Sequence, residues 1–150
     1  MANISIYTDG SSRGNPGPGG YGVILISGSH RKEISGGYQF TTNNRMELLS
    51  VIIGLESVKN IQKHDIVIYS DSQYVVNSIE KGWLFNWINK KKDFPNSDLW
   101  YRLLKVYSKN NVKLQWVKGH SDNEENNRCD YLATTASKSS NSLIDTGYKK

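Results

Sequence analysis

Alternation of hydrophobic and polar residues predicts three strands in the N-terminal part of the chain. The segment Ile4–Thr8 alternates between two faces, and Tyr21–Ser27 does the same. Gly28-Ser29 is typical of a hairpin turn and leads into a third strand, from His30 to about Phe40. Between the first two strands, the glycines and prolines of Gly14–Gly20 predict a loop. The three strands should therefore pair as antiparallel hairpins.

Beyond these strands, the pattern predicts helices that alternate with two further strands. Apolar residues recur at helical spacing from Asn44 to Lys59. Ile66–Tyr69 is apolar on both faces, as in a buried parallel strand, and Val112–Val117 is the last strand. Helical crossovers should make these two strands parallel to the first. The other expected helices are Gln73–Glu80, Leu99–Tyr107 with Asp98 as its cap, and Asn126–Lys138.

The length of the chain allows one domain with a hydrophobic core. It has 150 residues, a mass of 17.0 kDa and a mean hydropathy of −0.59. We expect a single domain over residues 1–138 and a tail over residues 139–150, whose serines and asparagines favour disorder. The chain has no apolar run long enough to span a bilayer and no signal-like start, which favours a cytoplasmic protein without a membrane partner. The single cysteine, Cys129, agrees with a reducing compartment.

The chain is basic, which makes the acids at its strand ends informative. A net charge of +5 and an isoelectric point near 9.2 favour a polyanionic partner, and a nucleic acid before a membrane. Nevertheless, Thr8-Asp9 and Ser70-Asp71 place a hydroxyl residue and then a carboxylate at the ends of two apolar strands. The helices after the third and fifth strands bring Glu47 and Asp130 to the same edge of the expected sheet, where open α/β sheets bind their ligands.

Each of these four acids also has an explanation that involves no function. Asp9 could begin a turn, and Glu47 could complete a capping box with Asn44. Asp71 could cap the following helix, and Asp130 could be a solvated helix charge. A cluster of four carboxylates, however, is destabilised by mutual repulsion unless cations neutralise it. Oxygen ligands suit Mg²⁺ or Mn²⁺ rather than Zn²⁺, and two such ions roughly 4 Å apart catalyse in-line displacement at phosphorus.

Several motifs follow one another along nearly the whole chain in the order of a known family. They are Thr8–Ser11, Gly14–Gly22, Thr41–Leu48, Ser70–Val75, Asp98–Trp100, Trp116–His120, Asn127–Asp130 and Asp145–Tyr148. With these motifs the chain resembles type 1 ribonuclease H, and its bacterial branch in particular. The resemblance implies an α/β fold with a five-stranded mixed sheet in the order 3-2-1-4-5, flanked by helices and carrying a basic helical protrusion.

For activity, the resemblance implies a monomeric endoribonuclease that hydrolyses the RNA strand of RNA–DNA hybrids and leaves 5′-phosphate and 3′-hydroxyl ends. By motif, Asp9, Glu47, Asp71 and Asp130 would hold two Mg²⁺ ions, which Mn²⁺ could replace. One ion would acidify the attacking water and the other would stabilise the departing 3′ oxygen. A lone loop histidine is usually a polar surface residue, but the motif implies that His120 transfers a proton or assists product release.

The resemblance also assigns contacts with the substrate near the carboxylates. Asn15, Asn44 and Gln73 match positions that read the 2′-hydroxyls of RNA in a shallow minor groove. Turn and cap chemistry would also explain these residue types, for Asn15 almost as well. The positions associated with a pocket for a phosphate of the DNA strand are Thr42, Arg45 and Asn96.

A basic aromatic segment, Lys81–Lys92, resembles the protrusion of the bacterial branch. It contains four lysines and no acid, so that its aromatic faces could pack on sugars and bases while its charges neutralise phosphates. Alternatively, its tryptophans are core anchors and its lysines only keep the outer face hydrated. Only residues 93–97 separate it from Asp98, which makes it shorter than other versions of this element. The contacts expected here are Trp83, Trp87, Lys90, Lys91 and Lys92.

Three other functions share some of these features. Integrase-like and Holliday-junction-like nucleases have a similar fold but lack the motifs Asn43–Glu47 and Val117–His120. A non-catalytic module that binds hybrids would not need all four acids. A glycosidase could use paired carboxylates, but it would leave the basic aromatic segment without a purpose. Cleavage of a hybrid that depends on Mg²⁺ would separate these alternatives.

Overall fold

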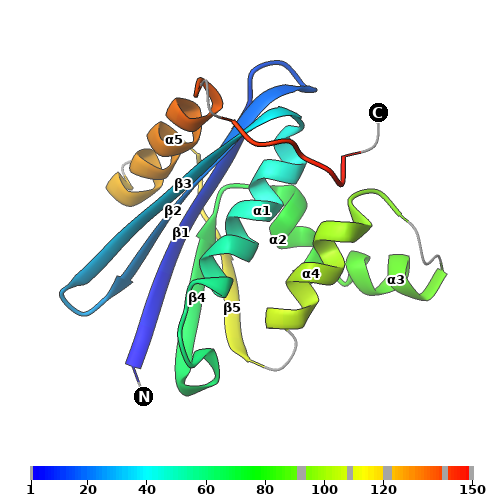
Figure 1. The fold of residues 1–150 in the computed structure, drawn as a ribbon. Coiled ribbons are helices and arrows are strands. Elements are labelled where there is room, and N and C mark those ends of the chain that lie inside the picture. The colour runs from blue at the N-terminus through cyan, green and yellow to red at the C-terminus, as the bar shows by residue number, and fades with distance from the viewer. Residues whose placement is uncertain (1, 91–93, 108–109, 120–122, 140–141, 149–150) are drawn as a thin grey trace.

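A five-stranded mixed sheet forms the centre of the fold (Figure 1). The computed structural model describes residues 2–90, 94–107, 110–119, 123–139 and 142–148. The strands are β1 (Ala2–Ser12), β2 (Gly17–Ser27), β3 (His30–Thr41), β4 (His64–Ser70) and β5 (Asn111–Trp116), in the order β3-β2-β1-β4-β5. β2 pairs antiparallel with β1 and β3, and β4 pairs parallel with β1 and β5. The predicted strand order and directions are confirmed.

Helices cover both faces of this sheet. Figure 1 shows α5 against one face, over β1, β2 and β3, and α1 against the other face beside α4. α3 extends away from the sheet at the side of α4. The helices are α1 (Asn43–Glu56), α2 (Gln73–Glu80), α3 (Trp83–Lys90), α4 (Ser97–Tyr107) and α5 (Glu124–Ser137), with a short 3-10 helix at Ile61–Lys63. None of the helices in the described ranges is long and apolar enough to cross a membrane.

The hydrophobic core lies between the sheet and α1. Ile6 of β1 and Ile68 of β4 are fully buried, as are Met46, Leu48 and Ile52 of α1. Because α1 is covered by the sheet on one side and by α4 on another, most of its residues are buried and it has no single apolar stripe. Burying a side chain of this size contributes about 1.5–3 kcal/mol. The core therefore holds α1, and the acid that it carries, firmly against the sheet.

Three strands, β1, β2 and β4, are longer than the sequence pattern predicts. β1 continues to Ser12, so that Asp9 lies inside the strand, and β2 begins at Gly17, within the segment predicted to be a loop. α5 crosses β2 so closely that a Cβ atom at Gly20 would lie 2.5 Å from the carbonyl oxygen of Ala133. Glycine at this point serves the close approach of a helix to a strand. The prediction of a loop throughout Gly14–Gly20 is therefore wrong.

The helix boundaries differ by a few residues from those predicted. α1 ends at Glu56 instead of Lys59, because the backbone N–H and the hydroxyl of Ser57 both donate to the carbonyl oxygen of Ile53 and close the last turn. α4 and α5 each begin two residues earlier than predicted. α3 is a separate helix within the basic aromatic segment.

Residues 142–148, which we call the C-terminal strap, run along the edge of β3 toward the starts of α1 and α4 (Figure 1). The N–H of Leu143 donates to the carbonyl oxygen of Gly37 at 2.9 Å, and its carbonyl oxygen accepts from the N–H of Gln39 at 2.7 Å. Farther along the strap, the hydroxyl of Thr41 donates to Asp145 at 2.6 Å. The strap thus extends the pairing of the edge strand.

Candidate active site

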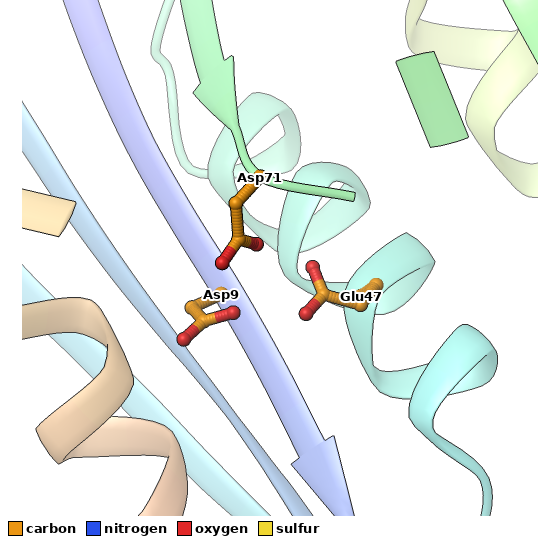
Figure 2. Close-up of side chains that lie close together, drawn as sticks. All are labelled: Asp9, Glu47 and Asp71. Atoms are coloured by element: carbon orange, nitrogen blue, oxygen red, sulfur yellow. The ribbon is translucent and has the colours of Figure 1, made fainter. Parts of the chain in front are cut away.

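Three carboxylates converge where β4 ends beside β1. The last pair in the register of these parallel strands is Thr8 with Ser70, so the residues that follow them, Asp9 and Asp71, are neighbours. Glu47 reaches the same point from the start of α1. One oxygen from each of the three carboxyl groups lies within 4.8 Å of the other two, and Figure 2 shows the groups facing one another. The structure thus brings together three of the four acids predicted to meet.

The position of Glu47 depends on a close contact between α1 and β1. A Cβ atom at Gly10 would lie 2.2 Å from the carbonyl carbon of Met46 and 2.3 Å from the backbone nitrogen of Glu47. Only glycine allows the helix to approach the strand this closely. The N–H of Gly10 donates to Oε1 of Glu47 at 3.1 Å and to Oδ1 of Asp9 at 3.0 Å. One backbone group therefore tethers two of the carboxylates.

The helix caps show that two of these acids are not needed for secondary structure. α1 is capped by Thr42, whose hydroxyl accepts from the N–H of Arg45. α2 is capped by Ser72 in the same way. Glu47 and Asp71 are therefore not caps, and the continuation of β1 beyond Asp9 also excludes a turn at that residue.

Asp130 approaches the same place from the opposite face of the sheet. It lies in α5, which packs over β1 and β2, and its negative charge acts on Asp9. It does not belong to the group of three whose oxygens lie within 4.8 Å of one another. The structure therefore places three carboxylates at one point and the fourth beside Asp9.

The carboxyl cluster is unfavourable when it is fully ionised. Burial raises the pKa of Asp9 to about 8; a hydrogen bond with Glu47 opposes this rise, and the charges of Asp71 and Asp130 add to it. Burial also raises the pKa of Glu47 well above its usual range, and the charge of Asp9 acts in the same direction. A cation at this point would reverse these shifts, because it stabilises the ionised carboxylates.

The chemistry of the cluster fits a hard divalent cation. All of its donors are carboxylate oxygens, the ligands that Mg²⁺ and Mn²⁺ prefer. In addition, Oε2 of Glu47 is buried and has no hydrogen-bond partner. A buried polar atom without a partner costs free energy unless another group meets it. Asp9, Glu47 and Asp71 could therefore hold such an ion, with Asp130 as a further ligand beside Asp9.

Three polar residues predicted to contact RNA lie next to these carboxylates. Asn44 is exposed in the first turn of α1, and Gln73 is exposed at the start of α2. Asn15 is exposed in the loop between β1 and β2, where its Oδ1 accepts from the N–H of Asn43 at 3.1 Å. All three predicted contacts are accessible from solvent; Asn44 and Gln73 lie on the elements that carry or follow the carboxylates, and Asn15 lies against the start of α1.

Arg45, predicted to bind a DNA phosphate, is already neutralised by two carboxylates. Its guanidinium donates twice to Asp98, at 2.8 and 2.7 Å, and twice to Asp145 of the strap, at 2.7 and 3.0 Å. The side chain of Arg45 is only 3% exposed. Burial alone would raise the pKa of Asp98, but the hydrogen bonds and charge of Arg45 hold it below its usual range. In this arrangement, Arg45 links α1 to α4 and to the strap.

The other two residues predicted for this phosphate pocket are also engaged. Asn96 accepts from Arg45 at 3.3 Å, and Thr42 caps α1. A cavity of about 600 Å³ borders Arg45 and Asn96, but Asp98 lines it as well. The sequence analysis missed this ion cluster, since Asp98 has the pattern of a helix cap and Asp145 falls in the tail. The only signal for it is the motif Asp145–Tyr148, which has no periodicity.

The aromatic residues of the predicted protrusion have two different environments. Trp83 is exposed, and Nζ of Lys81 lies 5.7 Å from the centre of its ring. Trp87 is half-buried, with its ring centre 5.8 Å from that of Phe94 and 6.2 Å from that of Trp100. Trp83 is therefore available to a ligand, whereas Trp87 anchors α3 to α4.

The remaining predicted site residues are lysines and a histidine. Lys90 is exposed at the C-terminal end of α3. Lys91, Lys92 and His120 lie outside the described residues, so their roles stay predictions.

Comparison with known proteins points to one family. The RNase H family model matches residues 1–138. The chain is 53% identical to ribonuclease H of Desulforamulus reducens, over 97% of this chain and 94% of that protein. It is 50% identical to ribonuclease H of Syntrophus aciditrophicus, over 97% of this chain and 86% of that protein. Among solved structures, LC9-RNase H1, a type 1 RNase H with the type 2 active-site motif, has a TM-score of 0.81 and 29% identity, over 99% of this chain and 79% of that one. In sequence and in fold, this chain belongs to the ribonuclease H family.

Proposed function

We propose that the chain is an endoribonuclease that hydrolyses the RNA strand of RNA–DNA hybrids and leaves 5′-phosphate and 3′-hydroxyl ends. The observation that carries this proposal is the cluster of Asp9, Glu47 and Asp71 in a member of the ribonuclease H family. Burial raises the pKa of Asp9 and of Glu47, and a cation would stabilise their ionised forms. Two Mg²⁺ ions, or Mn²⁺ in their place, would be held by these carboxylates together with Asp130.

The side chains around the cluster would prepare the scissile phosphate for attack by water. When bound, the ions supply a water of lowered pKa and stabilise the charge on the departing 3′ oxygen. Asp9 interacts with each of the other three acids, so it would be the central ligand. Gly119 lies so close to Asp71 that a Cβ atom would be 2.8 Å from its Oδ2. The next residue, His120, would transfer a proton at the reaction centre or help the product to leave.

Recognition of the RNA strand would use the exposed amides beside the carboxylates. Asn15, Asn44 and Gln73 each carry the donor and the acceptor that a 2′-hydroxyl requires. Farther along the hybrid, Trp83 would pack on a sugar or base. Lys90, Lys91 and Lys92 would neutralise phosphates. The hybrid would thus be read near the metal site and held along α3.

A panel of labelled nucleic acids tests the proposed activity. RNA–DNA hybrid, duplex RNA, duplex DNA and single-stranded RNA are each incubated with the protein in Mg²⁺ or in EDTA. We expect cleavage of the hybrid alone, only with Mg²⁺, and products that carry a 5′-phosphate. Binding of the hybrid without cleavage would identify a non-catalytic binding module instead, and cleavage of duplex DNA would identify another nuclease of the same fold.

Neutralising Lys90 and the two lysines that follow it in the sequence should weaken substrate binding more than chemistry. In a variant with glutamine at positions Lys90, Lys91 and Lys92, we expect KM to rise by about tenfold with kcat nearly unchanged. Each phosphate contact that is lost should reduce the slope of log KM against log salt concentration by about 0.9. Steady-state kinetics at several salt concentrations measure both quantities.

The matched control for this variant removes the same charge elsewhere. Glutamine at Lys63, Lys105 and Lys113, which are exposed on other elements, should leave KM and the salt slope near the wild-type values. If the salt slope of the α3 variant were unchanged, α3 would have no place in the binding surface.

We also propose that the protein acts as a cytoplasmic monomer whose catalytic domain spans residues 1–138. Light scattering should give a molar mass near 17.0 kDa at working concentration. Fractionation of cells that express a tagged protein would test its location.

A further inference from the structure

A groove of about 520 Å³ lies at the end of the sheet opposite to the carboxyl cluster. It is lined by the start of β1, the hairpin between β2 and β3, the turn after α1 and the start of β4. Ile4, which lines the groove, precedes Asp9 by five positions, and a strand rises about 3.3 Å per residue, so the two places are roughly 16 Å apart. The groove is therefore separate from the candidate active site.

The strand register brings basic side chains to one wall of this groove. Lys32 of β3 is paired with Leu25 of β2, and His30 is paired with Ser27. Directly opposed residues of two paired strands lie on the same face of a sheet, and so do residues two positions apart in one strand. These four residues therefore share one face, and all of them line the groove.

Two further basic residues reach the groove from other segments. His64 begins β4 two positions before Ile66, which is paired with Ile4, so His64 lies on the same face as both. Lys59 belongs to the turn after α1, next to Val58. Four basic residues from three separate parts of the chain thus surround a floor of aliphatic side chains. These basic residues are His30, Lys32, Lys59 and His64.

The groove has no acidic residue in its lining, and two carboxylates next to the lining residues in the chain are bound elsewhere. Glu33 is held by Arg31, whose guanidinium also bonds to Glu125 of α5 on the opposite face of the sheet. Glu56, at the end of α1, is held by Arg102 of α4. Arg31 therefore contributes little free charge to the groove, and none of these acids forms an ion pair with Lys32 or Lys59.

Lys32 and Lys59, by contrast, have no ion-pair partner among the residues that the structure describes. His64 is half-buried in the wall, and its Nδ1 is buried without a hydrogen-bond partner. Asp65, the next residue, points to the other face and accepts from Asn111. Uncompensated cations beside an unsatisfied polar atom are typical of a site whose ligand is an anion.

Hydrogen bonds at the end of α1 reduce the partial negative charge that this helix presents beside the groove. Carbonyl oxygens at a helix C-terminus carry partial negative charge when they have no donor. Here the carbonyl oxygen of Ile53 accepts from Ser57, and that of Leu55 accepts from the N–H of Val58 at 3.2 Å. Two carbonyl oxygens of the last turn are thus satisfied within the end of the helix.

We propose that this groove binds a nucleoside phosphate, with the phosphate at Lys32 and Lys59 and the sugar and base on the floor of Ile4, Leu25 and Val58. Ammonium groups bind phosphate strongly through charge-assisted hydrogen bonds. The volume lies within the usual range of about 300–1,000 Å³ for small-molecule sites. The phosphate could belong to a free nucleotide or to the 5′ end of a single-stranded oligonucleotide. The site does not depend on the proposed activity.

Calorimetric titration with ADP in metal-free buffer tests the site directly. We expect one molecule of ADP to bind with a Kd below about 1 mM at moderate salt. Chemical shifts should change at the amides of His30, Lys32, Lys59 and His64. The absence of saturable binding, or shift changes centred on Asp9, would overturn the proposal.

A double variant, Lys32→Gln with Lys59→Gln, should weaken ADP binding by at least about tenfold. Both lysines are exposed, and a thermal melt checks that the fold is retained. The control, Lys105→Gln with Lys113→Gln, removes the same charge and should change the affinity by less than about twofold. Equal weakening in both variants would show non-specific attraction and would overturn the site. Hydrolysis of an RNA–DNA hybrid should be unaffected by the double variant.

Two further ligands, a 5′-phosphorylated trinucleotide and inorganic phosphate, identify the source of the phosphate. A 5′-phosphorylated trinucleotide that competes with ADP at similar affinity would show that the groove accepts strand ends. A trinucleotide that binds far more weakly than ADP would show that the groove takes free nucleotides. Inorganic phosphate that bound as tightly as ADP would overturn the assignment of the aliphatic floor to a sugar and base.

Discussion

Replacing Asp9 with asparagine should lower the rate of hybrid hydrolysis by about a thousandfold or more. Asp9 is the acid that interacts with all three of the others, so its charge has the largest share in holding divalent cations. Asparagine keeps the shape of the side chain but removes this charge. Single-turnover cleavage of a labelled hybrid at saturating Mg²⁺ measures the effect without interference from product release.

The matched control for this substitution is Asp65→Asn. It makes the same chemical change in β4, the strand that leads to Asp71, but at the opposite end, where Asp65 accepts a hydrogen bond from Asn111. We expect its activity to stay within about twofold of the wild type, because surface changes remote from a site have small effects. If Asp9→Asn kept more than about a tenth of the activity, the carboxyl cluster would not be the metal site.

The Asp9→Asn substitution should also make the protein more stable in metal-free buffer at pH 8. The folded state raises the pKa of Asp9 from 3.8 to about 8, so it binds this proton more tightly than the unfolded state does. The contribution of Asp9 to the stability of the wild type is therefore greatest below about pH 4 and falls as the pH rises toward 8. The advantage of the variant should be absent near pH 4 and reach about 2 kcal/mol or more at pH 8. Urea unfolding at both pH values measures the difference, which saturating Mg²⁺ should reduce.

Replacing Arg45 with methionine should lower the free energy of unfolding by about 3–5 kcal/mol. Methionine keeps much of the volume but leaves Asp145, whose side chain is 10% exposed, without its cation. The same change releases Asp98, so that α1, α4 and the C-terminal strap lose their common link. Urea unfolding at pH 7 measures the loss.

The control for this variant is Arg102→Met, which breaks an exposed ion pair. Arg102 and Glu56 have side chains that are 42% and 33% exposed, and such pairs contribute at most about 1 kcal/mol. Arg45 holds the pKa of Asp98 below its usual value, although burial acts in the opposite direction. The stabilisation that the Arg45–Asp98 pair contributes is therefore present above about pH 4 and is lost as the pH falls further. The gap between the wild type and Arg45→Met should therefore narrow in acid. Equal losses in the two arginine variants would show that Arg45 is not a buried link.

Much of the fold follows from local patterns in the sequence. The turn at Gly28-Ser29 predicts an antiparallel pair, and the apolar run Ile66–Tyr69 predicts a buried parallel strand; both are present in the sheet. The meeting of Asp9 with Asp71 follows from the same patterns, since each acid comes directly after residues that pair with each other. Local periodicity is enough to predict a site when its functional side chains lie at the end of a helix or strand.

Other features depend on contacts between distant segments and leave no local pattern. The sequence around Gly20 has the composition of a loop. Only the packing of α5 across β2 explains why glycine is needed inside a strand at this position. From its motif alone, Arg45 is predicted to bind a phosphate. Its actual partners, Asp98 and Asp145, lie 53 and 100 residues away in the chain. A cation that two carboxylates neutralise cannot be distinguished from a free one before the fold is known.

The C-terminal strap has a consequence for how copies of the protein meet one another. β3 is an edge strand, and unpaired backbone groups at an edge can recruit a strand from another molecule into a growing aggregate. Leu143 occupies the backbone groups of Gly37 and Gln39, which closes this stretch to a foreign strand. Nearer the start of β3, the charged side chains of Arg31 and Lys32 oppose such pairing. The strap therefore shields part of the β3 edge and helps the protein to remain dispersed in concentrated solution.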